Sequence, residues 1–515
     1  MGFSNNADAN YTKAMKRLKG SSNTECKKSN WHKKIAWEMK KLRFMGTAIF
    51  PGEKKWRNIH FIIITTVFLC VAGCAMALLK FLPSAAAVAR EGSNGLMMML
   101  GEGKSTGNEE QYYSSTEIEK PHQGAQRSHT DSTLFCDRSS YRTDICILKG
   151  DIRTDSATNT VFLVSDKAAQ EEEDQKLKPY TRKWENYTMS SVTEISLKTI
   201  KPSVAPRCHV IHTAPALVFS TGGYTGNLFH DFTDVIVPLF VTVHHFNSRP
   251  VFLVVDHKDW WISKFQEILN QLTPYPLLDF QNDTRVHCFT KAIVGLRFHG
   301  DLRVDPATAP YQIKITDFQN MLQNAYGFAK KRKYFFARPK FVLIARKGSR
   351  AFLNQRKIVN LAEKLGFRVM VLFPDRDTKL KDMYEIVSSC DVFMGVHGAA
   401  LTHFLFLRPG AVFIQVVPLG IEWASRTFFR EPAMDMTGIH YLEYSILPEE
   451  SSLFDEYPKD HVYLTNPKVV NDKGWDATKE IYLDRQNVKI DLERLKKMLK
   501  TAMDLLQSKG HVNNA

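Results

Sequence analysis

The chain of 515 residues lacks several patterns that would indicate common functions. Its eight cysteines show no spacing typical of a zinc site, and no repeat at solenoid periods is visible. No predicted strand is followed by the three spaced glycines of a dinucleotide-binding turn, which argues against a membrane-tethered nicotinamide dehydrogenase. Hydrophobic residues make up 44% and charged residues 24%, as in ordinary folded proteins. The length exceeds what one hydrophobic core usually supports, so we expect two globular units with appendages.

Acidic residues are scarce in the first 58 residues, which carry much of the net charge of +15. An uncharged run over 61–79 follows, close to the ~20 residues that cross a bilayer. We predict a transmembrane signal anchor over 59–82; a cleaved signal peptide and a buried core helix are the less favoured alternatives. Basic flanks stay cytoplasmic, so residues 1–58 form a cytoplasmic tail and the rest lies in a lumen, a type II topology. This position explains the basic charge without nucleic-acid binding.

The predicted luminal part begins with residues 83–130, whose Gly-, Ser-, Glu- and Gln-rich composition is typical of a flexible stem. An oxidising lumen permits disulfides. Cys136 with Cys146 is the easiest local pair, Cys208 with Cys288 is a second candidate, and Cys390 suits a buried free thiol. Two sequons for glycosylation begin at Asn186 and Asn282.

Short apolar runs alternate with helical periodicity between Phe341 and Val417. Strands are predicted at 341–345, 368–373, 391–394 and 411–417, with helices over 352–365 and 380–387. This alternation indicates parallel strands joined by right-handed crossovers, a Rossmann-like half. A final amphipathic helix is predicted over 490–506, packing back across the domains.

The turn Gly395-Val-His-Gly-Ala-Ala400 closes one of these strands and predicts a seat for a nucleotide diphosphate. Glycines there let the backbone approach a ligand, and free amides at a helix start attract anionic oxygens. Arg346 and Arg350 follow another strand. By themselves they equally suit a solvated basic loop, but the carboxyl edge of a strand favours a ligand role. His397 also suits a buried core position.

A glycine-rich loop in the earlier half runs into an amphipathic helix near His230. His230, Asp231 or Asp234 could serve as general base, because an imidazole or carboxylate near neutral pKa can take a proton from a hydroxyl. A capping role for Asp231 and a packing role for His230 are equally consistent with the spacing. The strand at 251–255 makes this half α/β as well, and chemistry between the two halves is expected.

Four groups of residues together resemble the plant glycosyltransferase family 61, over about residue 136 to the C-terminal helix. They are Gly222-Gly-Tyr-Thr-Gly-Asn-Leu-Phe-His-Asp-Phe232, Arg346 with Arg350 and Asn354, Gly395-Val-His-Gly398, and Glu422-Trp423. The resemblance implies an α/β fold of GT-B type, with two Rossmann-like domains facing a cleft: an acceptor-side domain over 131–330 and a nucleotide-sugar domain over 331–515. It also implies an inverting, metal-independent mechanism without a cofactor, in which a UDP-sugar is a substrate.

The resemblance also assigns roles to the donor-side residues. Arg346 and Arg350 would grip the diphosphate, with Asn354 orienting them, and His397 and Gly398 would line its pocket. Glu422 and Trp423 would lie near the nucleoside or the transferred sugar.

On the acceptor side, Asp231 is the favoured base and His230 the second choice. Gly223, Asn227 and Asp234 belong to the same loop and helix start. No metal site is expected: Asp375-Arg-Asp377 has the spelling of a metal-binding motif, but the surrounding strands and helices favour an exposed charged loop.

The form Ala400-Leu-Thr-His403, with the later segments 404–410 and 446–453, resembles the family branch that decorates xylan. This implies a Golgi membrane enzyme that takes a UDP-pentose, arabinofuranose or xylose, and acts on xylan or xylo-oligosaccharide, with other xylan glycosyltransferases as further partners. The alternatives are a protein O-linked or N-glycan glycosyltransferase of the same family, or a non-catalytic scaffold subunit of a Golgi xylan synthase complex.

Overall fold

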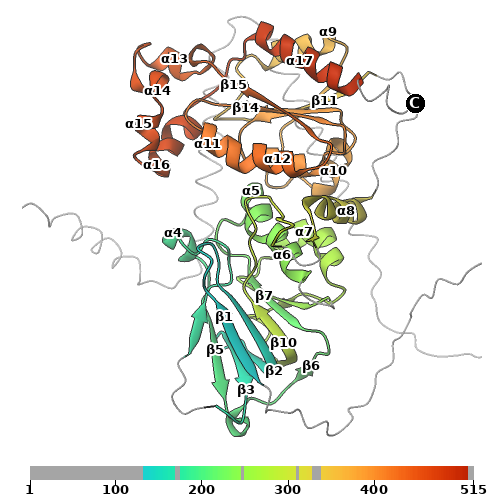
Figure 1. Cartoon of the computed structure of the whole chain (residues 1–515), viewed down its shortest axis with the longest axis vertical. Helices are drawn as coiled ribbons and strands as arrows, with labels where there is room; N and C mark the ends of the chain where they lie inside the picture. The colour runs from blue at the N-terminus through green and yellow to red at the C-terminus, as the bar shows by residue number, and fades with distance from the viewer. Residues whose placement is uncertain (1–131, 169–173, 245–248, 309–311, 328–337, 508–515) are drawn as a thin grey trace, which may run out of the picture. The chain divides into compact units, whose positions relative to one another are not determined.

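The computed structural model describes residues 132–168, 174–244, 249–308, 312–327 and 338–507 (Figure 1). The predicted tail 1–58, span 59–82 and stem 83–130 lie outside these residues. Within the described ranges, no helix combines the length and apolar character that a bilayer crossing requires. The described residues belong to one compact unit, Ile118–Ala515. We call residues 132–327 the earlier half and residues 338–507 the later half.

The earlier half contains a ten-stranded sheet in the order β4-β5-β3-β2-β10-β7-β8-β9, with β1 paired to β2 and β6 to β10. Its strands are β1 (Thr133–Asp137), β2 (Ile145–Asp155), β3 (Thr160–Val164), β4 (Gln175–Leu177), β5 (Ile195–Ile200), β6 (Val210–Ile211), β7 (Ala216–Ser220), β8 (Val251–Val255), β9 (Leu278–Asp279) and β10 (His287–Val294). Strands β10, β7, β8 and β9 run parallel, whereas β2 is antiparallel to β1, β3 and β10. The Rossmann-like prediction for this half is therefore wrong on the β2 side, because short connections between β1, β2 and β3 permit only antiparallel pairing.

The helical segments of the earlier half are α4 (Asn186–Met189), η1 (Pro202–Val204), α5 (Leu228–His230), η2 (Asp231–Ile236), α6 (Val237–Val243), α7 (Asp259–Leu272) and α8 (Ile315–Tyr326). Helices α5 to α8 gather near the parallel strand β7, whereas α4 lies apart from them, nearer β1 (Figure 1). The segment η2 has π-helical hydrogen bonding between α5 and α6. Such widened turns occur frequently at functional sites.

The later half contains a parallel five-stranded sheet in the order β12-β11-β13-β14-β15. The strands are β11 (Lys340–Ile344), β12 (Arg368–Leu372), β13 (Val392–Val396), β14 (Val412–Val417) and β15 (His440–Ser445). The first four lie within two residues of their predicted positions, and this Rossmann-like prediction is confirmed. The half-exposed strand β15 was not predicted, because its sequence HYLEYS has little apolar character.

The helical segments of the later half include two helices close to their predicted positions, α9 (Gln355–Lys364) and α10 (Leu380–Val387). The segment after the Gly395–Ala400 turn is a 3₁₀ helix, η4 (Ala399–Phe406). The others are α11 (Glu422–Ser425), η5 (Arg426–Arg430), α12 (Glu431–Asp435), η6 (Pro448–Glu450), α13 (Leu453–Glu456), α14 (Val462–Thr465), α15 (Lys468–Asn471), α16 (Trp475–Thr478), η7 (Lys479–Asp484) and α17 (Leu492–Gln507).

One apolar core joins the two halves. Phe229 of the earlier half lies 5.0 Å from Phe428 and 5.8 Å from Phe429 of the later half, between ring centroids. Phe232 likewise packs against Phe406 at 6.2 Å. Burying a phenylalanine stabilises a fold by about 1.5–3 kcal/mol, so these contacts hold the halves together at this end. The gap expected between two domains is therefore bridged by apolar side chains at this point.

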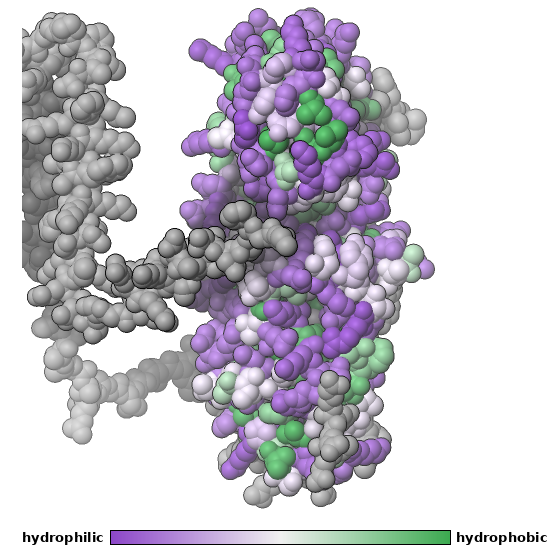
Figure 2. Space-filling model, turned by 90° about the vertical axis from the view of Figure 1, so that its left-hand side faces the viewer, coloured by the Kyte–Doolittle hydropathy of each residue, from purple (hydrophilic) through white to green (hydrophobic). Residues whose placement is uncertain are grey.

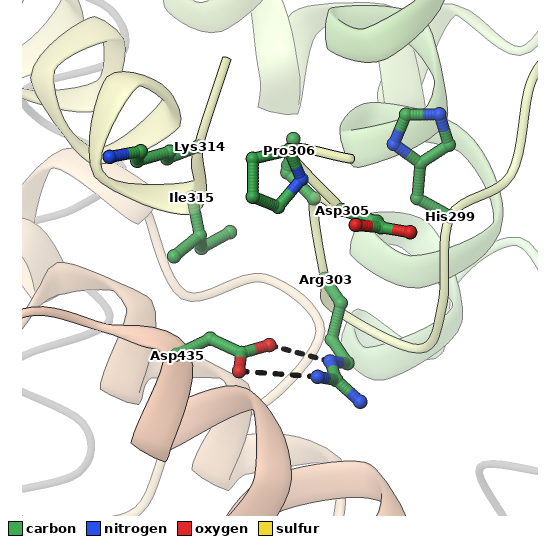
Figure 3. A pocket seen from close by; sticks show the side chains of 8 residues that line it. His299, Arg303, Asp305, Pro306, Lys314, Ile315 and Asp435 are labelled. Carbon is green, nitrogen blue, oxygen red and sulfur yellow. Dashed lines mark hydrogen bonds and ion pairs between the residues drawn. The ribbon is translucent and has the colours of Figure 1, made fainter. Parts of the chain in front are cut away.

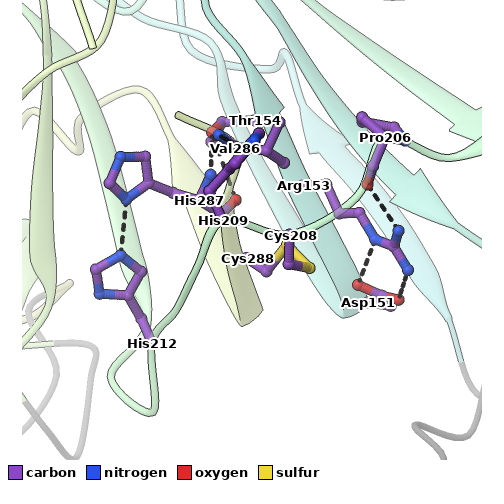
Figure 4. The surroundings of a disulfide bond; sticks show 10 residues. All are labelled: Asp151, Arg153, Thr154, Pro206, Cys208, His209, His212, Val286, His287 and Cys288. Atoms are coloured by element: carbon purple, nitrogen blue, oxygen red, sulfur yellow. Dashed lines mark hydrogen bonds and ion pairs between the residues drawn. A yellow bond between two sulfur atoms is a disulfide. The ribbon is translucent and has the colours of Figure 1, made fainter. Parts of the chain in front are cut away.

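Two disulfides join the pairs indicated by the sequence. Cys136 is bonded to Cys146 within the β1–β2 pair, and Cys208 is bonded to Cys288 at the start of β10. The second bond ties the segment before β6 to the sheet, beside the guanidinium of Arg153 (Figure 4). Cys390 is a buried free thiol. The side chains of Asn186 and Asn282 are exposed, and their glycosylation stays a prediction.

Candidate donor and acceptor sites

The order of the later sheet locates its binding edge. Numbered along the chain, its five strands lie in the order two, one, three, four, five, so the order reverses between β11 and β13. Ligands of open parallel sheets bind outside the carboxyl ends of the strands at such a reversal. Arg346 follows β11, and His397 and Gly398 follow β13. The topology therefore brings these predicted donor residues to one edge.

Gly398 leaves room for two guanidinium groups. A Cβ atom at Gly398 would lie 2.8 Å from Nη1 of Arg346 and 3.0 Å from Nη1 of Arg350. Nη1 of Arg350 also donates a hydrogen bond to the carbonyl oxygen of His397 at 3.1 Å. A larger residue at Gly398 would displace both arginines, which gives this glycine a positioning role at the candidate site.

The two arginines bring unneutralised positive charge to this edge. Burial lowers the pKa of Arg346. Burial, then the charge of Arg346, lowers the pKa of Arg350 to about 10, and the charge of Asp484 opposes this only in part. Among the described residues neither guanidinium forms an ion pair with a carboxylate, and Nε of Arg350 is buried without a hydrogen-bond partner. Buried cations normally need a counter-charge, so an anionic ligand such as a diphosphate would satisfy this pair.

His397 lies behind the arginines and is only 5% exposed. Its Nδ1 lies 3.1 Å from Oγ of Ser425 and 3.2 Å from Nε2 of Gln415. Burial, together with Arg350 and Arg346, lowers the pKa of His397 to about 3, so its ring is neutral. The buried-core alternative from the sequence therefore describes its imidazole better than a pocket-lining role, and its carbonyl oxygen supplies the contact with Arg350.

A C-terminal segment fixes the loop that carries the arginines. The side-chain amide of Asn354 donates to the carbonyl oxygen of Ile490 at 2.7 Å and its oxygen accepts from the amide of Ile490 at 3.1 Å. The backbone amide of Arg350 donates to the carbonyl oxygen of Gln486 at 2.6 Å. Asn354 thus anchors the loop through the backbone of Ile490, and a direct orienting contact with the arginines stays a prediction.

In the earlier half, His230 lies in a network with a buried carboxylate. Its Nδ1 is 2.8 Å from Oδ2 of Asp234, whose side chain is fully buried. Arg182 donates through Nε to both oxygens of Asp234 at 3.0 Å. Burial raises the pKa of Asp234, but the hydrogen bond from His230 and the charge of Arg182 outweigh it and lower the pKa overall. Nδ1 of His230 also lies 3.2 Å from Nη2 of Arg182, so its role depends on the tautomer of the ring. In the tautomer with the proton on Nδ1, the ring donates to Asp234, because a carboxylate only accepts.

Asp231 occupies a different environment and is only 1% exposed. Its Oδ1 accepts hydrogen bonds from the indole Nε1 of Trp261 at 2.9 Å and from the amide of Gly226 at 3.0 Å. Burial is the largest cause that raises its pKa, to about 6. These bonds hold the loop before α5 against α7. His230, with 18% of its side chain exposed, is more open to a ligand than Asp231, whereas Asp231 has the carboxyl whose pKa is raised toward neutral. Which of the two is the base stays a prediction.

Two further loop residues have local structural roles. Asn227 caps α5, because its side-chain oxygen accepts from the amide of Phe229 at 3.1 Å. Gly223 has a φ of +59°, and a Cβ there would lie 2.5 Å from the ring of Tyr180. Both residues shape the loop that presents His230, and their contact with an acceptor stays a prediction.

The predicted donor residues Glu422 and Trp423 begin α11, which follows β14. Both are exposed, and Oε1 of Glu422 accepts from the amide of Gly420 at 3.2 Å. Asp375 accepts from the amide of Asp377 at 3.1 Å and the hydroxyl of Thr378 at 2.7 Å. The Asp375–Asp377 segment is therefore a self-bonded turn with an exposed carboxylate.

A cavity of about 390 Å³ lies elsewhere, where α8 and α12 approach each other (Figure 3). At its wall Arg303 donates from Nε to Asp435 at 2.5 Å and from Nη2 to the same carboxylate at 3.2 Å, which ties the two halves together. None of the predicted donor or base residues lines it.

Arg182, Tyr180 and Trp475 were missed by sequence reasoning. Arg182 and Tyr180 reach Asp234 from 52 and 54 residues away in sequence. The exposed ring of Trp475 lies 5.7 Å from that of Trp423. None of the three lies in a recognisable local pattern, so only homologous sequences or the structure could reveal them.

Comparisons with known proteins show which sequences this chain resembles. The model of the glycosyltransferase 61 family matches residues 226–414, which include His230 and the two donor-side arginines. Xylan glycosyltransferase MUCI21 of Arabidopsis thaliana is 43% identical over 409 residues, 75% of this chain and 81% of that protein. Alpha-1,3-arabinosyltransferase XAT3 of Oryza sativa subsp. japonica is 40% identical, over 75% of this chain and 67% of its own length. Beta-1,2-xylosyltransferase XYXT1 of the same rice is 35% identical, over 73% and 84%.

Proposed function

This chain belongs to glycosyltransferase family 61, and we propose that it transfers a pentose, arabinofuranose or xylose, from a UDP-sugar to xylan or a xylan side chain. Its relatives include enzymes named for arabinosyl and for xylosyl transfer. Pocket shape, which distinguishes similar sugars by small free-energy differences, decides between the two pentoses. The proposal also includes a GT-B arrangement and a Golgi location with type II topology. The basic segment before the apolar run 61–79 supports the type II topology.

The unneutralised pair Arg346 and Arg350 carries the proposal. As the bond between the anomeric carbon and the diphosphate breaks, negative charge develops on the leaving UDP. Guanidinium groups held in a partly buried site stabilise such charge without reorganising, which lowers the barrier. Because these cations supply the compensating charge, we expect transfer to be independent of a metal ion and to need no cofactor.

His230 is the proposed general base. Its Nε2 takes the proton from an acceptor hydroxyl, and the oxygen attacks the anomeric carbon from the side opposite the diphosphate. The bond to the diphosphate oxygen breaks with its electron pair, so configuration inverts and UDP departs. Asp234 holds the ring through Nδ1 and stabilises the imidazolium that forms. Asp231 is the alternative base.

The proposal is tested with full-length protein, UDP-arabinofuranose or UDP-xylose, and xylo-oligosaccharide in the presence of a chelator. We expect transfer without added metal. Arg346→Ala should weaken UDP binding about 10- to 100-fold, since hydrogen bonds to charged groups contribute about 1.5–3 kcal/mol. The exposed Arg356 on α9 provides a matched control, and Arg356→Ala should bind UDP normally.

Three outcomes would contradict parts of the proposal. Wild-type protein without measurable UDP affinity would favour the scaffold alternative. Strict dependence on manganese would refute metal independence. Normal UDP binding by Arg346→Ala would remove this arginine from the donor site.

A further inference from the structure

A continuous series of aromatic rings leads away from the proposed base. The rings of His230 and Phe229 are 5.3 Å apart between centroids, and Phe229 lies 5.0 Å from Phe428. Phe428 lies 5.9 Å from Trp423, and Trp423 lies 5.7 Å from Trp475. The series begins on α5 of the earlier half and ends on α16 of the later half. It therefore crosses the contact between the two halves.

The outer end of this series is open to solvent. Trp423 is 48% exposed and Trp475 is 43% exposed, and their ring planes meet at 75°. Tryptophan is a costly side chain to leave in water, and exposed indoles frequently mark binding surfaces. Within the series Phe229 is buried and Phe428 is half-buried. The two tryptophans thus offer free ring faces beyond His230.

Local contacts hold the tryptophans in place. Nδ2 of Asn471 donates to the carbonyl oxygen of Gly420 at 3.0 Å, and its Oδ1 accepts from the hydroxyl of Thr478 at 2.9 Å. Gly420 belongs to the loop before Trp423, and Thr478 ends the helix that begins at Trp475. Asn471 therefore links the supports of both rings. A fixed pair of rings binds a ligand with little loss of side-chain entropy.

The surroundings suit a neutral, hydroxyl-rich ligand. Figure 2 shows the side of the molecule that carries α13 to α16 in Figure 1, where hydrophilic side chains surround small, separate apolar groups. Glu422 and Asp476 next to the tryptophans are exposed. A pyranose ring presents C–H groups to an aromatic face and hydroxyls to such polar neighbours. A membrane or an apolar protein partner would require a broader apolar face.

We propose that Trp423, which the family resemblance places on the donor side, instead forms with Trp475 a subsite for the polysaccharide acceptor. Sugar rings stack on these indoles while another sugar unit of the polysaccharide reaches His230. The inference rests on the proposed function, and it adds a binding site that extends the acceptor contact to α16. Because Trp475 is at the far end of the series, only an acceptor of several sugar units spans from His230 to it.

The test compares short and long acceptors. With saturating donor, Trp475→Ala should raise the KM for xylohexaose about tenfold, within the range of one aromatic contact, and leave kcat nearly unchanged. The KM for xylobiose should stay within twofold of wild type, as should UDP affinity. Trp475→Phe should restore most of the xylohexaose affinity. Tyr275→Ala is the matched control, since Tyr275 is 40% exposed in the loop after α7 and should leave both acceptors unaffected.

Other outcomes overturn the proposal in distinguishable ways. Equal losses for xylobiose and xylohexaose would assign Trp475 a structural role, and weaker UDP binding would assign it to the nucleobase. An unchanged xylohexaose KM would remove the subsite. Titration calorimetry of xylohexaose with wild type and Trp475→Ala gives a readout that does not require turnover. Wild-type binding without transfer would refute the proposed function while keeping the subsite, and absence of wild-type binding would refute the subsite.

Discussion

In the earlier half, the buried guanidinium of Arg182 lies 3.0 Å from Asp234 and 2.8 Å from Glu185, whereas in the later half Arg346 and Arg350 approach each other beside Gly398 without a carboxylate partner. The first arrangement is internally neutralised and fixes an imidazole. The second has hydrogen bonds to carbonyl oxygens but no ion pair with a carboxylate, which suits the binding of an anion. This difference matches the two tasks of group transfer, in which one side moves a proton and the other stabilises a leaving group.

The largest expected effect concerns the base. His230→Ala should lower kcat about 1000-fold, within the range for loss of a general base, and leave UDP affinity unchanged. Asp231→Asn should retain most of kcat, because an amide oxygen can still accept from Trp261 and Gly226. Steady-state kinetics with UDP titration separates the two. A deeper loss of kcat in Asp231→Asn than in His230→Ala would restore Asp231 as the base.

The second prediction tests the contrast in charge directly. Arg182→Met should lower the free energy of unfolding by about 3–4 kcal/mol, because Asp234 would stay buried without its counter-charge. Arg350→Met should change ligand-free stability by less than about 1 kcal/mol or increase it, since it removes like-charge repulsion with Arg346. Denaturant unfolding without nucleotide measures both. Similar destabilisation by the two substitutions would contradict the expected difference between a paired Arg182 and an unpaired Arg350.

The third prediction concerns the loss of stability of the later half at acidic pH. Folded His397 stays neutral, since its pKa is about 3, but in the unfolded chain a histidine binds a proton below about pH 6.5. The unfolded state therefore takes up more protons as the pH falls, and the stability that is present above pH 6.5 is lost below it. Between pH 7 and pH 5 this loss should be about 2 kcal/mol. His403, buried with a pKa of about 4, contributes in the same direction.

Unfolding curves of wild type and His397→Gln at pH 7 and pH 5 measure this effect. The variant should lose less stability between the two pH values, by up to about 2 kcal/mol. An equal loss in both proteins would show that His397 does not titrate on unfolding.

The sequence predicted the later half more accurately than the earlier one. Buried parallel strands such as β11 and β13 are continuous apolar runs, which are visible in one chain. Strands β1, β2, β4 and β5 contain charged residues and β15 is half-exposed, and none of them was predicted. A local sequence pattern can predict strands that are buried on both faces, but it predicts poorly the strands that have one exposed face.

The predicted site residues divide in a similar way. Arg346, Arg350 and Gly398 come together because they follow neighbouring parallel strands, a relation that topology alone implies. The sequence could not predict which of His230 and Asp231 is better placed to act as the general base, because adjacent residues on one helical turn point in different directions. Their environments come from Arg182 and Trp261, which lie 48 and 30 residues away.

The sequence by itself determined the class of the protein: the α/β pattern of the later half, the glycines and arginines at its binding edge, and the cysteines able to pair. These features arise from the local preferences of the residues for helix or strand, and from residue types such as glycine and cysteine that have few possible structural roles. The tertiary structure alone decided which imidazole has a carboxylate behind it, which guanidinium groups lack one, and which tryptophans face solvent. Those properties depend on contacts between residues distant along the chain, and local preferences do not specify such contacts.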